Sequence, residues 1–265
     1  MKKTYFISDL HLDPSRPHLF KLFYEFTEKI RSDAEALYIL GDLFEFWIGD
    51  DIIDLPIGKP YFPVIEQLKS LSDAGTKIYF IQGNRDFLIG EHFMQRIGGK
   101  LLPDETVIDL YGTPTLIMHG DTLCTDDKSY QFMRKILRLK IVQKLYLSMS
   151  PEKRAQKASQ VRQKTSTRTK QKNYSILDVN QQEVEKVVSR GAAETMLERS
   201  DDDPKGEIKS SKSRGVSFLI HGHTHRPAEH DFLLEGVPMK RIVLGDWGEK
   251  SSYIVAQENM FELIY

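Results

Sequence analysis

The chain has 265 residues, of which 40% are hydrophobic and 28% charged, so it can bury a substantial core as one domain. Its formal net charge of -1 excludes a strong overall attraction to nucleic acid or to an acidic membrane. Cys124 is the only cysteine, which excludes an internal disulfide and a thiolate-only metal site and indicates a reducing compartment such as the cytoplasm.

The first residues, MKKTYFISDLHLD, have too short an apolar stretch to serve as a signal peptide. No apolar run reaches the roughly 18 residues that a membrane-spanning helix needs. We therefore expect a protein that is not embedded in a membrane, although it can still lie on a membrane surface.

Five segments combine a short apolar run, typical of a buried strand, with a polar cluster at its end. Helical patterns over 19–31 and 61–74 separate the first three, which indicates alternating strands and helices in a roughly parallel sheet. In such a sheet the polar clusters meet at one edge, beyond the carboxyl ends of the strands. The five segments are TYFISDLH from Thr4, ALYILGD from Ala36, KIYFIQGNRD from Lys77, TPTLIMHGD from Thr113 and SFLIHGHTH from Ser217.

A helical, strongly basic stretch without strand patterns covers residues 128–180, and we interpret it as a cap inserted between strands. From Arg134 to Lys172 it has thirteen Lys or Arg residues against one acid, Glu152, with apolar residues interleaved. Such a face is either simply solvated or, given its apolar residues, drawn to an anionic membrane surface. Nucleic acid is not expected as a partner, because few aromatic side chains are available for base stacking.

Residues 190–214, after the cap, are rich in charge, Ser, Pro and Gly, and we expect them to form an exposed loop. From Arg241 onward, the return of strand-like alternation predicts a final hairpin that completes a sheet. The predicted organisation is one domain over 1–265 with the cap inserted into it.

The five polar clusters together supply the residue types of a metal centre, with two carboxylates, four imidazoles and one amide. Hard oxygen mixed with imidazole nitrogen suits manganese, iron or zinc better than calcium. Seven ligands suit two divalent ions that share a bridging carboxylate, and such a pair, about 3.5–4 Å apart, activates water and clamps a phosphoryl oxygen. The pattern therefore predicts hydrolysis at phosphorus. The candidate ligands are Asp9, His11, Asp42, Asn84, His119, His223 and His225.

Each short motif alone has an ordinary alternative. SDLH, GD and HGD also occur at plain turns, and a single histidine is more often a hydrogen-bonded core or surface residue than a ligand. Recurrence of ligand-type residues at five successive strand ends favours the metal centre.

The ordered motifs DLH, GD, GNRD, HGD and GHTH resemble the signature of the calcineurin-like metallophosphoesterase superfamily, which is D-x-H, G-D, G-N-H-[DE], H-G and G-H-x-H. The resemblance covers Asp9 to His225. It implies an α/β fold, a two-sheet β-sandwich flanked by helices, in place of the single sheet that the strand pattern suggests. The implied ligand sets are Asp9, His11, Asp42 and His225 for one ion, and Asp42, Asn84, His119 and His223 for the other.

Arg85 departs from that signature, which has histidine at this position. A histidine can protonate a poor alkoxide leaving group, whereas an arginine stays charged and donates no proton at working pH. We therefore expect a leaving group that departs already ionised, such as a phosphate in a pyrophosphate link, and a bidentate grip of Arg85 on phosphate. The alternative is a structural or surface arginine.

Longer stretches resemble the family of UDP-2,3-diacylglucosamine pyrophosphohydrolases of Gram-negative lipid A biosynthesis. They are GDLFEFWIGDD from Gly41, HGDTLCTDDKSYQ from His119, a basic cap ending near LDVNQ, and IHGHTHRPA from Ile220. The resemblance implies manganese-dependent hydrolysis of the acylated UDP-sugar to UMP and lipid X, with Asp42, Arg85 and His119 in catalysis. It also implies a peripheral enzyme at the cytoplasmic face of the inner membrane, and no obligate protein partner is predicted.

The same resemblance implies a set of substrate contacts, two of which depart from the family. Thr165 stands where other members have Ser, and Thr169 stands where they have Asn, so Thr169 cannot reproduce an amide contact. The implied contacts are Asn84, Arg85, Asp127, Thr165, Thr169, Lys172 and His223.

Two other functions stay open from the sequence. One is a broader phosphodiesterase or nucleotidase, which would turn over soluble substrates and be indifferent to acylation. The other is a non-catalytic scaffold that binds proteins, a class that tends to lose metal ligands. Retention of all seven candidate ligands favours an enzyme.

Overall fold

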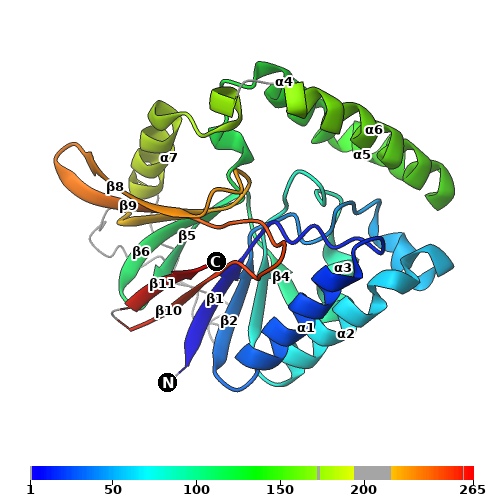
Figure 1. Ribbon diagram of the computed structural model, residues 1–265, viewed down its shortest axis with the longest axis horizontal. Coiled ribbons are helices and arrows are strands. Elements are labelled where there is room, and N and C mark those ends of the chain that lie inside the picture. Colours follow the sequence, from blue (N-terminus) through cyan, green and yellow to red (C-terminus); the bar gives the residue numbers. More distant parts are fainter. Residues whose placement is uncertain (1, 172–173, 194–215, 259) are drawn as a thin grey trace, which may run out of the picture.

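The computed structural model describes residues 2–171, 174–193, 216–258 and 260–265, and its strands form two sheets (Figure 1). The first sheet has the strand order β11-β10-β1-β2-β3-β4, in which β1 to β4 are parallel and β10 runs antiparallel to β1. Strands β10 and β11 form the expected final hairpin. The strands are β1 (Lys3–Ile7), β2 (Ala34–Ile39), β3 (Lys77–Phe80), β4 (Gly99–Leu101), β10 (Tyr253–Gln257) and β11 (Met260–Ile264).

The second sheet has the order β5-β6-β7-β9-β8. Its central strands β6, β7 and β9 are parallel, and antiparallel β5 and β8 flank them. The two-sheet fold that the family resemblance implied is confirmed, and the single sheet is wrong, because a strand pattern does not say which strands pair. The strands are β5 (Glu105–Leu110), β6 (Thr113–Met118), β7 (Phe218–His221), β8 (Ala228–Leu234) and β9 (Val237–Val243).

Alternation along the strands separates the core into layers. In β1, Tyr5 and Ile7 pack in the cluster with the helices, whereas Phe6 belongs to the cluster between the two sheets, together with Ile117 and Ile220. The helices on the outer face of the first sheet are α1 (Pro17–Ile30), α2 (Phe62–Asp73) and α3 (Glu91–Ile97). Two 3₁₀ turns, η1 (Asp50–Asp54) and η2 (Pro56–Tyr61), lie between β2 and α2.

Helix α7 (Gln181–Ala193) covers the outer face of the second sheet (Figure 1). Its Val184, Val187 and Val188 are fully buried in one cluster with Leu116 and Met118 of β6. The helix includes residues 190–193, the first four positions of the predicted loop over 190–214. The remainder of that loop lies outside the described residues.

The basic cap forms three helices, α4 (Lys128–Leu137), α5 (Lys140–Leu147) and α6 (Pro151–Gln171), followed by the 3₁₀ turn η4 (Tyr174–Leu177). Figure 1 shows these helices together at the top, above the loops that leave the sheets. No residue of α4 or α5 is buried, so these two helices contribute little to the core and their apolar side chains remain available to a ligand or a surface.

Candidate metal centre

The seven candidate ligands all follow the carboxyl end of a strand. Asp9 and His11 follow β1, Asp42 follows β2 and Asn84 follows β3, in the first sheet. The others follow strands of the second sheet: His119 follows β6, and His223 and His225 follow β7. The cluster therefore lies where the ends of the two sheets meet.

Backbone hydrogen bonds hold these loops together. The amide of Asp9 donates to the carbonyl of Gly41 at 3.1 Å, and the amide of His11 donates to the carbonyl of Asp42 at 3.0 Å. Between the sheets, the amide of His223 donates to Asp9 Oδ2 at 2.8 Å, and Ser8 Oγ donates to the same oxygen at 2.5 Å. The orientation of the Asp9 carboxylate is thus fixed before any ion binds.

Five of the candidate ligands have left-handed backbone conformations, with φ between 49° and 68°. Side-chain-bearing residues rarely adopt this region, and each such residue costs on the order of 1–3 kcal/mol unless its surroundings compensate. Backbone strain that is concentrated in neighbouring residues of this kind is typical of a functional site. The five residues are Asp9, His11, Asp42, His223 and His225.

Two glycines provide the space that the cluster occupies. A Cβ on Gly83 would overlap Asp42 Oδ1 and the Asp42 amide. A Cβ on Gly222 would overlap Ser8 Oγ and Asp9 Oδ2. The GN and GH motifs therefore have glycine because carboxylates lie directly against the backbone.

One end of the cluster has facing polar atoms that either a proton or a cation would satisfy. The Nε2 atoms of His11 and His225 lie 3.2 Å apart, and His225 Nε2 lies 3.3 Å from Asp9 Oδ1. Within the described part of the chain, Asp9 Oδ1 and His11 Nδ1 are buried and have no hydrogen-bond partner. A divalent ion among these three side chains would satisfy the carboxylate and both imidazoles.

The other end is arranged in the same way. His119 Nδ1 lies 2.8 Å from the carbonyl of Leu40, so Nδ1 carries the proton and Nε2 points its lone pair into the cluster. That Nε2 lies 3.0 Å from Asn84 Oδ1 and 3.8 Å from Asp42 Oδ1, all acceptor atoms. Acceptors facing one another at these distances need a proton or a cation between them.

Two groups of ligand atoms lie close enough to hold an ion, with all atoms of a group within 4.8 Å of one another. One consists of Asp9, His11 and His225, and the other of Asp9, Asp42 and His119. His223 lies next to the second group, with its ring 5.1 Å from that of His119. The donor set fits divalent metal ions, as the residue types predict.

Burial and mutual attraction set the charges in the cluster. Burial raises the pKa of Asp42 to about 7 and lowers the pKa of His223 to about 4. Burial also disfavours the charged form of His225, but the Asp9 carboxylate outweighs burial and raises its pKa to about 9. Without an ion, His225 is therefore protonated at neutral pH and must lose that proton to become a ligand.

Two buried carboxylates that the sequence reasoning did not single out support the cluster. Asp86 accepts hydrogen bonds from the amides of Leu43 at 2.8 Å and Gly83 at 2.9 Å, which joins the loops after β2 and β3. Glu45 accepts a hydrogen bond from Arg16 at 2.6 Å and lies 3.8 Å from Arg85. Both follow the GD and GNR motifs closely, but their residue type alone does not separate them from surface acids.

Arg85 lies at the edge of the cluster. Its amide donates to Asp42 Oδ1 at 2.8 Å, while its side chain is one-third exposed and lines the adjoining cavity. The arginine is therefore held beside the candidate ligands by its backbone, and its side chain borders the cavity.

A cavity of about 610 Å³ runs from the metal cluster to the cap. One end is lined by His11, Asp42, Asn84, Arg85, His223 and His225. The opposite walls are mainly apolar and come from the loop after β2 and from helices α4, α5 and α6. They include Trp47, Ile48, Met133, Leu137, Val142, Tyr146, Ala158 and Val161.

Arg134 of α4 and Arg138, which directly follows that helix, attach the cap beside the cluster. Arg134 donates from Nε to Asp121 and from Nη2 to Asp104, both at 2.6 Å. Arg138 donates to the Gln82 side chain at 2.8 Å and to the carbonyl of Gly83 at 3.1 Å. Part of the positive charge of the cap is thus structural.

The remaining candidate substrate contacts are placed unequally. Asp127 lines the cavity and begins α4, where its Oδ1 accepts hydrogen bonds from Ser129 Oγ at 2.8 Å and the Tyr130 amide at 3.0 Å. Thr165 and Thr169 belong to α6, but their side chains lie outside the described part, as does Lys172 altogether.

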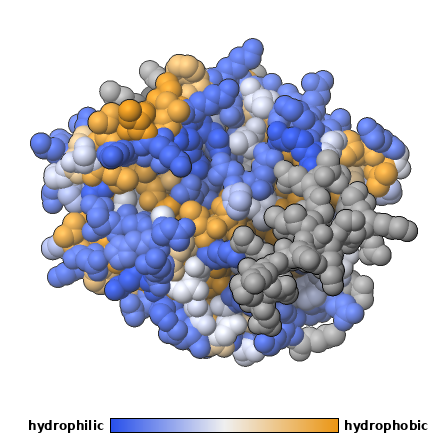
Figure 2. Space-filling view, turned by 180° about the vertical axis from the view of Figure 1, so that it is seen from behind, coloured by the Kyte–Doolittle hydropathy of each residue, from blue (hydrophilic) through white to orange (hydrophobic). Residues whose placement is uncertain are grey.

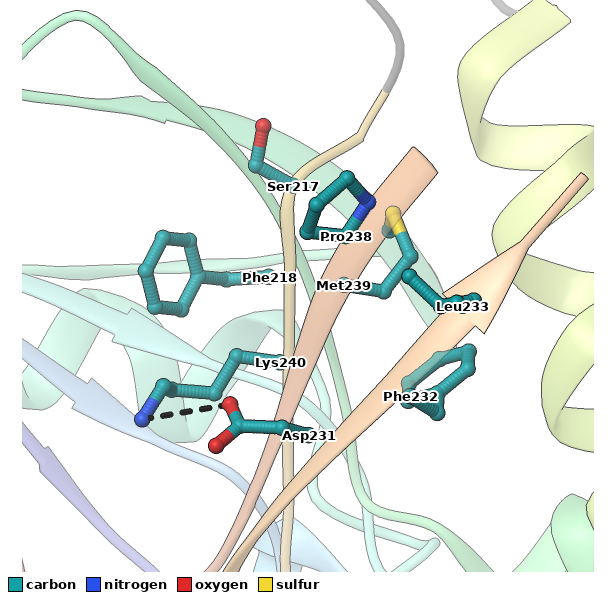
Figure 3. Close-up of a pocket in the computed structure, with 8 residues that line it drawn as sticks. All are labelled: Ser217, Phe218, Asp231, Phe232, Leu233, Pro238, Met239 and Lys240. Atoms are coloured by element: carbon teal, nitrogen blue, oxygen red, sulfur yellow. Dashed lines mark ion pairs between the residues drawn. The ribbon is translucent and has the colours of Figure 1, made fainter. Parts of the chain in front are cut away.

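A second hollow lies on the second sheet, at strands β8 and β9 (Figure 3). It is lined by residues such as Phe218, Leu233 and Pro238, with an ion pair of 3.4 Å between Lys240 and Asp231. None of its lining residues is a candidate ligand or substrate contact.

Sequence comparison gives relatives over the whole chain. The UDP-2,3-diacylglucosamine hydrolase of Histophilus somni (strain 129Pt) is 42% identical over 265 residues, which cover 100% of both chains. The enzyme of that name from Pseudomonas aeruginosa (strain UCBPP-PA14) is 42% identical over 91% of this chain and 90% of its own. That of Vibrio parahaemolyticus serotype O3:K6 (strain RIMD 2210633) is 42% identical over 98% and 96%.

Among solved structures, that of a novel archaeal phosphodiesterase aligns with 99% of this chain and 98% of its own, at 13% identity and a TM-score of 0.45, too weak a likeness for an argument. The model of the calcineurin-like phosphoesterase family matches residues 2–227, a span that includes all seven candidate ligands. The chain belongs to the calcineurin-like phosphoesterase family.

Proposed function

We propose that this chain hydrolyses the pyrophosphate bond of UDP-2,3-diacylglucosamine and releases UMP and lipid X in lipid A biosynthesis. The observation that carries the proposal is the cavity of about 610 Å³, which joins the polar cluster at one end to apolar cap walls at the other. A substrate with a diphosphate at one end and acyl chains at the other matches both ends. The full-length relatives with this activity in their names support the same substrate.

Divalent metal ions are implied by the family, and we propose manganese, since the donors mix carboxylate oxygen with imidazole nitrogen. Bound divalent ions would supply positive charge for the phosphoryl oxygens and lower the pKa of a bound water molecule. The proposed ligands of the first ion are Asp9, His11, Asp42 and His225, and those of the second are Asp42, Asn84, His119 and His223.

Arg85 is the proposed catalytic group of the chain itself. Its guanidinium would hold a phosphate through two hydrogen bonds and stabilise the negative charge that develops on it. Arginine cannot protonate a leaving group, and none is needed here, because lipid X departs as an ionised phosphate. Asn84 and His223 border the same end of the cavity and would orient the phosphate nearest the uridine.

The sugar head group would lie between the cluster and the cap. We propose that Asp127 contacts it, since Asp127 lines the cavity close to the start of α4, between the cluster and the cap. Lys172, Thr165 and Thr169 remain proposed contacts by family likeness. The apolar walls of the cap would hold the acyl chains.

We further propose that the cap rests on the cytoplasmic face of the inner membrane, as a peripheral contact. Phe132 and Ile141 are each 68% exposed and Leu145 is 66% exposed, beside exposed Lys135 and Lys140. Figure 2 shows an apolar patch at the upper left, where the cap lies in this reversed view. Apolar side chains interleaved with lysines favour an anionic lipid surface. Among the described helices, none has the length and apolar character needed to cross a bilayer.

The substrate proposal is tested by supplying manganese and UDP-2,3-diacylglucosamine in detergent to wild type and to His11→Ala, with a soluble phosphodiester in parallel. We expect UMP release by wild type, loss of that release in the variant, and little turnover of the soluble ester. Turnover of the soluble ester without hydrolysis of the lipid would reject the substrate and retain the metal centre.

The membrane proposal needs its own test, which is co-sedimentation with vesicles of phosphatidylglycerol and phosphatidylethanolamine. Replacement of Phe132, Ile141 and Leu145 by Ser is expected to abolish sedimentation while the soluble fraction stays folded. Replacement of exposed Leu233, on β8, serves as the control and should change nothing. If the triple variant and the Leu233 control bind the vesicles equally well, the membrane contact does not involve Phe132, Ile141 and Leu145.

A further inference from the structure

Arg154 of helix α6 is fully buried, with a relative exposure of 0%, and it is the largest side chain of the described chain with so little exposure. Arginine is almost never fully buried unless it is paired. Residues 151–161 of the same helix are otherwise exposed or only partly buried, so the burial of Arg154 requires a specific reason.

The contacts of Arg154 join the cap to the core. Nη1 donates to the carbonyl of Ile48 at 2.6 Å, and Nη2 donates to the carboxylate of Asp51. Ile48 and Asp51 belong to the loop and 3₁₀ turn that follow β2. On the cap side, Tyr146 of α5 donates its hydroxyl to the carbonyl of Arg154 at 2.9 Å. One residue therefore connects α5, α6 and the loop after β2.

Gly49 shows that the core loop is shaped around this guanidinium. Its φ is 127°, and a Cβ there would lie 2.5 Å from Arg154 Nη1 and 2.6 Å from Leu147 of α5. A side chain at this position would both strain the backbone and occupy the place of the arginine.

The arginine lies behind the apolar end of the cavity. Lys157, Ala158 and Val161 line the cavity from α6, and they come three, four and seven residues after Arg154, on the same face of the helix. Its acceptor Ile48 lines the cavity from the core side. The hydrogen bonds of Arg154 thus fix the distance between two facing walls of the cavity.

We propose that Arg154 is a positioning residue that sets the width of the apolar end of the cavity and thereby the fit of the acyl chains. The inference rests on the proposed function. Arg154 contacts none of the candidate metal ligands, so its effect is confined to substrates that reach the cap. Loss of its hydrogen bonds would release α6 from the loop after β2 and widen the space between Ile48 and Val161.

Arg154→Met removes the hydrogen bonds and keeps an unbranched apolar stem, and Lys153→Met is a matched control at the exposed neighbouring position. For UDP-2,3-diacylglucosamine with long acyl chains, we expect KM to rise about 10-fold in Arg154→Met, since small displacements of binding walls have effects of 10- to 100-fold. The preference for long over short chains should weaken, while turnover of a soluble phosphodiester stays at the wild-type level. Lys153→Met should match wild type throughout.

Unchanged KM and unchanged chain-length preference in folded Arg154→Met would overturn the proposal. Equal losses on the lipid and on the soluble ester would also overturn it, because they would indicate general damage. If Arg154→Met does not fold, Asp51→Asn and Arg154→Lys weaken the same contacts, and both are expected to shift the chain-length preference in the same direction.

Hydrogen exchange gives a readout that does not depend on the substrate. In Arg154→Met, amides of residues 151–161 are expected to exchange faster than in wild type. The loops at Asp9 and Asp42, which follow β1 and β2, should exchange at the wild-type rate. If Arg154→Met does not fold, the same measurement is made on Asp51→Asn. Unchanged exchange in α6 would contradict the role of Arg154. If wild type hydrolyses only soluble esters, the proposed function fails, and the exchange experiment still decides whether Arg154 holds the cap.

Discussion

The Nε2 atoms of His11 and His225 lie 3.2 Å apart, although 214 residues separate the two histidines in the chain. One follows β1 of the first sheet and the other follows β7 of the second, so their contact depends on the packing of the two sheets. Both imidazoles also lie within 4 Å of the buried Asp9 Oδ1. The two sheets therefore complete one ligand group that neither contains alone.

Metal affinity should fall as the pH is lowered. Asp9 raises the pKa of His225 to about 9, so below that pH the proton must leave before an ion can bind. Each unit of pH below 9 should then weaken manganese binding about tenfold for each proton displaced. Calorimetry at pH 6.5, 7.5 and 8.5, in buffers of different ionisation enthalpy, measures both the affinity and the protons released. Affinity that is constant over this range would contradict the protonated state of His225.

Gly222→Ala should abolish activity without unfolding the chain. The added Cβ would overlap Ser8 Oγ and Asp9 Oδ2, so the Asp9 carboxylate must move. We expect at least about a 100-fold loss in kcat/KM on UDP-2,3-diacylglucosamine, as for other small displacements of reacting groups. Gly248→Ala is the control, because its φ is not left-handed and a Cβ there meets nothing within 4 Å. Near-normal activity of Gly222→Ala would show that Asp9 need not hold its position.

Asp86→Asn should lower the free energy of unfolding, because Asp86 supports the loops that carry the metal ligands and is not itself a proposed ligand. The Asp86 carboxylate accepts from the amides of Asp42, Leu43 and Gly83, and an amide side chain has one acceptor oxygen where the carboxylate has two. Loss of charge-assisted hydrogen bonds to buried amides is expected to cost about 3 kcal/mol of the free energy of unfolding. Urea denaturation measures it. Asp73→Asn, at an exposed ion pair with Lys69, should stay within about 0.5 kcal/mol of wild type.

Arg85→His should change which leaving groups the enzyme tolerates. Loss of the guanidinium is expected to lower pyrophosphate turnover about 100-fold. A histidine can protonate an alkoxide, so turnover of alkyl phosphodiesters should fall less or rise. The measurement is the rate for a series of phosphodiesters whose leaving groups differ in pKa. The slope of the logarithm of the rate against the leaving-group pKa should be shallower in Arg85→His than in wild type. Arg96→His, on the exposed face of α3, is the control. An unchanged slope would remove the assigned role of Arg85.

The strands that carry candidate ligands could be predicted because each is a short apolar run that ends in a polar cluster. Their division between two sheets could not, since periodicity identifies a buried face and not a pairing partner. Helix α7 was missed although Val184, Val187 and Val188 have helical spacing, because the polar residues around them resemble those of the cap and the following loop.

The residues that support the metal ligands could not be predicted from the sequence either. Glu45 and Asp86 become distinctive only through burial, since both are common surface residues in other settings. Arg134, Arg138 and Arg154 count as basic cap residues in the sequence, yet their side chains turn inward to carboxylates and carbonyls. Counting charge therefore overstates how much of the cap faces a membrane.

The two-ion centre is tested most directly by measuring manganese bound per chain, by calorimetry and by metal analysis after gel filtration, in wild type and in Asp42→Ala. Asp42 is the proposed shared ligand, so its loss should affect both ions at once. We expect two ions per wild-type chain and fewer than one in Asp42→Ala, with Asp73→Ala unchanged. A single ion in wild type, or two ions retained by Asp42→Ala, would contradict the two-ion centre.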